Sequence, residues 1–187
     1  MTEQMWWYAT RAAGLMTWLT ATAAVVVGLA LSLKFVRSRT GPWLLDLHRF
    51  LGGISAVFLI AHVGTLFADS YVDLEPRDLF IPGESAWETE AMAWGIVAAY
   101  VLIAVEVTSL LRSQLRRRIW WFIHGLSFVT VGAGGYHAWI VGSDVHNPIA
   151  WTIAGTGSLM VLGLVSLRMQ RGQQEEDPTG MHLGDRE

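Results

Sequence analysis

Four histidines lie inside apolar segments, where ionisable side chains are rare. His48 and His62 are 14 residues apart in one segment, and His124 and His137 are 13 residues apart in another. An ionisable side chain inside a bilayer is costly and is a functional candidate by default. A hydrogen bond to a neighbouring helix would explain one such histidine. Two segments that each carry two histidines indicate a binding site instead.

The spacing places these side chains at two depths. Fourteen residues correspond to about 21 Å of helix rise, and thirteen to about 19.5 Å. If both segments cross the membrane in the same direction, His48 faces His124 at one depth and His62 faces His137 at the other. Imidazoles on facing helices suit the two axial positions of a haem iron, and filling both positions favours electron transfer over oxygen binding. Zinc fits less well, because no carboxylate or cysteine is near enough in sequence to complete its ligand set.

The elements that position the histidines must be membrane-spanning helices. Of the 187 residues, 52% are hydrophobic and only 16% are charged, whereas an average soluble domain has about 25% charged residues. Lipid cannot satisfy backbone polar groups, so apolar segments that cross about 30 Å of hydrocarbon are helical. We therefore expect an all-α, polytopic membrane helical bundle with five spans. These are expected at about 12–34, 43–68, 91–111, 119–141 and 148–168, between a short N-terminus (1–11) and a disordered tail (169–187).

The positions of lysine and arginine predict the orientation of the bundle. One side carries only Arg11 and Arg77, together with the acidic segment 69–90. Cationic residues mark the cytoplasmic side, so the N-terminus is expected outside and the C-terminus inside, in a bacterial inner membrane. Nucleic acid is not expected as a partner, because the basic residues lie at the ends of spans. The residues on the cationic side are Lys34, Arg37, Arg39, Arg112, Arg116, Arg117, Arg118, Arg168 and Arg171.

A regular helix does not present both histidines of the fourth span on one face. Thirteen residues leave the second side chain about 140° from the first, whereas fourteen bring it back to within about 40°. Either this span is distorted, which Gly132, Gly134 and Gly135 would permit, or its two haems lie on different flanks. Further glycines near the histidines would admit a flat macrocycle or serve ordinary helix packing. They are Gly52, Gly53, Gly64 and Gly125.

Two segments resemble the ferric reductase-like transmembrane domain. They are HRFLGGISAVFLIAH and HGLSFVTVGAGGYH, with TSLLRSQLRRRIWWFIH leading into the second. This superfamily includes ferric reductases, the membrane part of NADPH oxidases and the haem subunit of a bacterial methionine sulfoxide reductase system. The resemblance covers about Trp43 to Asp144, although members usually have six spans. It implies two non-covalent haems b that carry electrons to an acceptor at the outer face. His48 and His124 would be ligands of the inner haem, and His62 and His137 of the outer one.

The electron donor is expected to be a separate molecule. Oxidase and reductase members of the superfamily continue into flavin and nicotinamide domains, whereas the polar residues after the fifth span contain no Gly-rich phosphate loop. A cytoplasmic flavin reductase or a membrane quinol would therefore supply the flavin or quinone. The absence of cysteine excludes thioether-attached haem and cysteine-ligated clusters.

Two other functions are compatible with the same residues. One is a haem-free membrane anchor or a metal or proton transporter subunit. The other is a quinol-oxidising cytochrome b subunit of a larger dehydrogenase. An absorption spectrum separates the first from the haem-binding hypotheses.

Several further polar residues are weaker candidates. Glu106 would exchange protons with a quinone or, more simply, extend to the interface. Asp144 and His146 would contact an acceptor or a metal ion, or else lie in a solvated loop, and His182 has no assigned role. Four arginines would pair with haem propionates, although anchoring at the cytoplasmic surface is the simpler explanation. They are Arg49, Arg116, Arg117 and Arg118.

Overall fold

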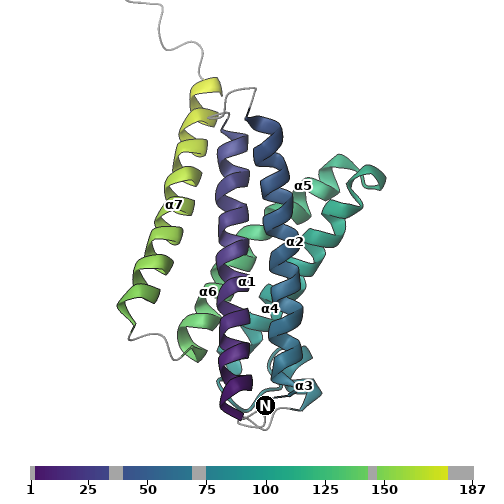
Figure 1. Cartoon of the computed structure of the whole chain (residues 1–187). Helices are drawn as coiled ribbons and strands as arrows, with labels where there is room; N and C mark the ends of the chain where they lie inside the picture. Colours follow the sequence, from purple (N-terminus) through teal and green to yellow (C-terminus); the bar gives the residue numbers. More distant parts are fainter. Residues whose placement is uncertain (1–2, 34–39, 69–74, 143–146, 177–187) are drawn as a thin grey trace, which may run out of the picture.

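The computed structural model describes residues 3–33, 40–68, 75–142 and 147–176. Within these ranges the chain is a bundle of helices without strands, which confirms the expected all-α class (Figure 1). In chain order the elements are α1 (Glu3–Ser32), α2 (Gly41–Leu66), α3 (Pro76–Phe80), α4 (Thr89–Leu110), the 3-10 helix η1 (Arg112–Gln114), α5 (Arg117–Gly125), α6 (Ser127–Val141) and α7 (Pro148–Glu176).

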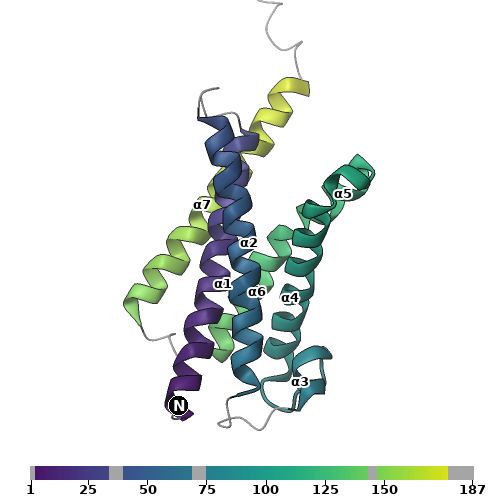
Figure 2. The same ribbon diagram turned by 45° about the vertical axis from the view of Figure 1, so that its right-hand side comes forward.

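Four helices, α1, α2, α4 and α7, are long and apolar enough to cross a membrane. The expected fourth span is formed by two shorter helices, α5 and α6, which both pack against α4. The chain is therefore a polytopic helical membrane protein. Two views show α1 and α2 side by side, with α7 against the opposite side of α1 from α4 (Figures 1 and 2).

The expected fourth span is broken at Leu126, between its two histidines. The Leu126 N–H donates to the carbonyls of Ile123 and His124, and a new helix begins at the next residue. Of the two alternatives that the 13-residue spacing allows, the structure shows the distorted span. The position of the distortion differs from the one expected, because α6 continues without interruption through the glycines at 132–135. The break instead follows Gly125, a residue type with low helix propensity.

The bundle is closely packed between the two histidine levels. Ser55 is seven residues from both His48 and His62, and its side chain is fully buried. Thr130 and Val131, midway between the histidines of α5 and α6, are also buried. Small residues let membrane helices approach closely, because lipid gives no hydrophobic driving force for their association. The two levels are therefore separated by protein side chains.

Two helix ends lie beyond the expected boundaries. α1 begins at Glu3, and α7 continues to Glu176, so residues 169–176 are helical although they were expected within the disordered tail. Hydropathy marks the lipid-facing part of a helix, while Met, Gln, Arg and Glu are strong helix formers that extend it into water. Near this end the Arg171 guanidinium donates to the Leu33 carbonyl at 2.6 Å. The rest of the tail, 177–187, lies outside the described residues.

Candidate functional site

The four histidines form two pairs between α2 and the α5–α6 segment. The ring centroids of His48 and His124 are 5.8 Å apart, and those of His62 and His137 are 6.4 Å apart. The ring planes cross at 69° in the first pair and 79° in the second. The structure thus brings together the residues that the matching depths predict to face each other.

Both centroid separations fit two imidazoles bound on opposite sides of one metal ion. Bonds of about 2 Å from a metal to each histidine nitrogen would put the two ring centroids about 6 Å apart. Within the described residues, no third histidine, aspartate or glutamate joins either pair to form a larger donor group. Two imidazoles without further ligands suit the axial positions of a haem and do not suit a tetrahedral zinc ion.

Hydrogen bonds to neighbouring helices select the tautomer of three of these histidines. In each, Nδ1 lies within hydrogen-bond distance of a backbone carbonyl oxygen on α1 or α4. A carbonyl oxygen only accepts, so Nδ1 carries the proton and Nε2 of the neutral ring keeps its lone pair. Metal-ligating histidines are typically held in this way. The bonds join His48 to Ala24 at 2.8 Å, His62 to Thr10 at 2.8 Å and His137 to Ala91 at 2.9 Å.

His62 on α2 and His137 on α6 have the same tautomer. His62 and His137 both donate through Nδ1 to carbonyls, so both Nε2 atoms are acceptors. Neither neutral ring can donate a hydrogen bond to the other. Two neighbouring imidazoles that each keep an Nε2 lone pair can both bind an electron-poor centre such as a metal ion.

The remaining histidine, His124, has a different environment. Its Nδ1 is 3.4 Å from the Ser109 hydroxyl oxygen, and its ring stacks on Trp120 at 4.8 Å with an angle of 19°. The Arg112 guanidinium lies 4.6 Å from the centroid of the Trp120 ring. The Trp120 Nε1 atom is buried and has no hydrogen-bond partner among the described residues. An unpaired buried donor is costly, and a carboxylate such as a haem propionate is the kind of acceptor it lacks.

A cavity of about 380 Å³ adjoins the pair formed by His62 and His137. Its walls include Arg11 of α1, Leu79 of α3 and Trp87 of the following loop. The end of α3, from which this loop begins, is held against α4, since the Tyr100 hydroxyl donates to the carbonyl of Phe80 at 2.7 Å. Sequence reasoning treated this loop only as an acidic segment and missed its part in the site. The available signal was Trp87, a large aromatic side chain in a segment rich in carboxylates.

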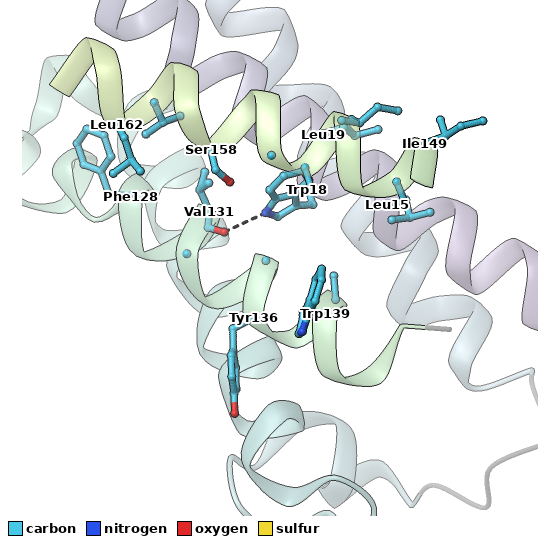
Figure 3. Close-up of a pocket in the computed structure, with 18 of the residues that line it drawn as sticks. Leu15, Trp18, Leu19, Phe128, Val131, Tyr136, Trp139, Ile149, Ser158 and Leu162 are labelled. Atoms are coloured by element: carbon cyan, nitrogen blue, oxygen red, sulfur yellow. Dashed lines mark hydrogen bonds between the residues drawn. The ribbon is translucent and has the colours of Figure 1, made fainter. Parts of the chain in front are cut away.

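A larger cavity, of about 980 Å³, lies between α1, α6 and α7 and has mainly apolar walls. Figure 3 shows Trp18 inside it, with its Nε1–H donating to the Val131 carbonyl at 2.9 Å. Gly135 makes this contact possible, because a Cβ atom there would be 3.1 Å from the Trp18 Nε1 atom. Leu15 and Ala138 line this cavity and also the one beside His62 and His137. Gly134 and Gly135 of α6 therefore lie against this tryptophan, and the helix continues through them.

The carboxylate of Glu106 occupies the space that a side chain at Gly52 would need. A Cβ atom at Gly52 would be 2.5 Å from the Glu106 Oε1 atom. In this structure Gly52 therefore admits a carboxylate from α4. By contrast, in the part of the chain that the structure describes, no atom outside the local helix lies within 4 Å of a Cβ atom built at Gly53, Gly64 or Gly125.

The other candidates from sequence lie on the surface or outside the described residues. Arg49 and Asp46 form an exposed ion pair at 3.5 Å. Arg116, Arg117 and Arg118 are exposed at the start of α5, as anchoring at a membrane surface requires. The segment 143–146, with its aspartate and histidine, is outside the described residues.

Comparison with known proteins identifies one family. Residues 12–135 match the family described as ferric reductase like transmembrane component. The matched segment contains three of the paired histidines and ends two residues before His137. No curated protein and no solved structure matches the chain.

Proposed function

Because the chain belongs to the ferric reductase-like transmembrane family, we propose that it carries single electrons across a membrane through two non-covalent b-type haems. The observation that supports this most is the geometry of the paired histidines. Each pair has the separation of two axial ligands, and three of the four rings are held in the tautomer that leaves Nε2 free. Isolated buried histidines would need neither feature.

Each histidine pair of this chain would bind one of the two haems. His48 and His124 would be the ligands at one level, and His62 and His137 those at the other. A bound haem supplies a one-electron iron couple, and filling both axial positions favours electron transfer. The closely packed layer around Ser55 would keep water from the path between the levels.

Charge distribution supports a direction for the transfer. Arg112, Arg116, Arg117 and Arg118 are exposed close in sequence to His124, and such a surface attracts an acidic donor protein. We assign this end to the cytoplasm of a bacterial cell, with a flavin reductase or a quinol as the electron donor. The other end, which carries the acidic residues of the described segment 75–90, would favour a cationic acceptor such as ferric iron. The bundle surface between them would contact membrane lipid.

Reconstituted vesicles test this function directly. With a flavin reductase and its reductant on the side of the α5 arginines, we expect a membrane-impermeant ferric complex on the opposite side to be reduced. Vesicles with no protein give the background rate. Equal rates with and without the chain would contradict the proposal and favour the haem-free anchor or transporter.

A further inference from the structure

The carbonyls that accept hydrogen bonds from the histidines share a local sequence feature. Each lies four residues before a glycine of the same helix. In an α-helix the carbonyl of residue i bonds to the N–H of residue i+4, so each of these carbonyls also accepts from its glycine. The pairs of carbonyl residue and glycine are Thr10 and Gly14, Ala24 and Gly28, and Ala91 and Gly95.

A side chain at the glycine position would cover the carbonyl. The Cα–Cβ bond in a helix tilts toward the N-terminus, so a side chain lies over the turn that precedes it. A Cβ atom at Gly95 would be 2.5 Å from the His137 Nδ1 atom. At Gly14 the corresponding distance to His62 Nδ1 is 2.9 Å. Real Cβ contacts of this length essentially do not occur, so the imidazole would have to leave its position.

The third glycine shows the same contact in a milder form. A Cβ atom at Gly28 would be 3.0 Å from the His48 Cε1 atom and 3.3 Å from its Nδ1 atom. The predicted displacement therefore decreases in the order Gly95, Gly14, Gly28. This order provides a graded test within one protein.

The same spacing recurs on the helices that receive the histidines. Gly14 and Gly28 on α1 are 14 residues apart, which is the separation of His62 and His48 on the adjacent helix α2. On α4, Gly95 and Ser109 are also 14 residues apart, and they contact His137 and His124 respectively. Thus α1 and α4 each carry two receiving positions at the two histidine levels.

We propose that Gly14, Gly28 and Gly95 are positioning residues that hold His62, His48 and His137 as metal ligands. By leaving a carbonyl uncovered, each glycine lets the imidazole dock with Nδ1–H as the donor. This contact selects the tautomer and turns the lone pair of Nε2 away from the receiving helix. The inference rests on the proposed haem-binding function and adds the residues that prepare the ligands for it.

The fourth receiving position is different, and the two sites are therefore not equivalent. Ser109 presents a hydroxyl at 3.4 Å from His124 Nδ1, and a hydroxyl donates as readily as it accepts. It does not select one tautomer. The pair of His62 and His137 thus has two carbonyl contacts of this type, whereas the pair of His48 and His124 has one.

Alanine substitutions test the proposal, with haem content, midpoint potentials and ferric spectra measured on purified protein. Gly95→Ala should lose most of the haem at the His62–His137 level and keep the other haem unchanged. Gly14→Ala should act on the same haem less strongly, and Gly28→Ala on the other haem only. Where haem is retained, its midpoint potential should rise, because a weaker Nδ1 hydrogen bond makes the imidazole less basic.

These variants distinguish haem loss caused by a displaced histidine from haem loss caused by unfolding. Alanine is a better helix former than glycine, so a loss of haem would run against the change in helix propensity. The haem at the untouched level reports that each variant is folded. Gly163→Ala is the matched control, because no atom of the described residues outside the local helix lies within 4 Å of a Cβ atom there. It should leave both haems unchanged.

Two results would overturn the inference. In the first, all three glycine variants keep the wild-type haem content and midpoint potentials, while His137→Ala loses one haem. This result would contradict the role of the glycines but not the proposed haem-binding function. The other is equal loss of both haems in all three variants with the Gly163→Ala control intact, since positioning acts at one level only. Absence of haem from the wild-type protein would instead remove the proposed function, and this inference with it.

Discussion

Replacing both histidines of one pair should remove no more haem than replacing either of them alone. His48→Ala, His124→Ala and the double variant should each lose mainly one of the two haems, because both ligands serve the same iron. The cross-pair variant His48→Ala/His62→Ala should lose both. Ligands at one level cannot replace those at the other, which lie about 20 Å away along the helix. Haem per chain, counted as the pyridine haemochrome, measures this non-additivity.

Controls for this experiment come from the histidines outside the pairs. His146→Ala and His182→Ala should keep two haems per chain with unchanged spectra. The pairing would be wrong if His48→Ala and His62→Ala removed the same haem, or if the double variant of one pair lost both.

The second large effect concerns transfer across the membrane. In vesicles, His62→Ala should retain a reducible haem at the level of His48, yet ferric reduction on the opposite side should fall to near the background rate. The reason is distance, since the remaining haem would be separated from the far surface by roughly 20 Å of packed bundle. Stopped-flow reduction of the haem and reduction of the external acceptor are followed on the same preparation.

The outcome distinguishes a two-haem path from other routes. The substitution His182→Ala, in the C-terminal tail, should transfer electrons at the wild-type rate. If His62→Ala also transferred them at that rate, two haems in series would be the wrong mechanism, even with both present in the wild type.

The pairing of the histidines could be predicted from sequence because two simple quantities determine it. Rise per residue fixes the depth of each side chain, and the direction of each span decides which depths match. His48 therefore meets His124, and His62 meets His137, as the structure shows. The helical membrane architecture could also be predicted from the sequence, since the backbone polar groups of a span in lipid must be hydrogen-bonded within the protein.

The position of the break in the fourth span was harder to predict from the sequence. Periodicity predicted either a distortion between His124 and His137 or haems on different flanks, and three closely spaced glycines made the region 132–135 the expected place for a distortion. Glycine destabilises a helix by about 1 kcal/mol relative to alanine, but tertiary contacts decide at which glycine the helix ends. Trp18 packs on Gly135 and donates to the Val131 carbonyl, which supports α6 there. The helix ends at Gly125 instead.

The partners of the histidines were not predictable from residue types. Three of the acceptors are backbone carbonyls, which every residue possesses, so no side chain marks them. The signal was the 14-residue spacing of Gly14 and Gly28, which matches the spacing on α2. It becomes interpretable only when α1 is known to pack against α2. The contact between Glu106 and Gly52 depends in the same way on which faces of α2 and α4 meet.

Haem content of the purified wild-type chain tests the central claim most directly. The protein is purified in detergent, its oxidised and reduced absorption spectra are recorded, and acid–acetone extraction is followed by a haem count per chain. We predict two b-type haems per chain, both extractable, because each histidine pair supplies two ligands and the sequence has no cysteine for covalent attachment. A folded, detergent-stable chain without haem absorbance, or with a single haem that all four histidine variants remove, would contradict the account.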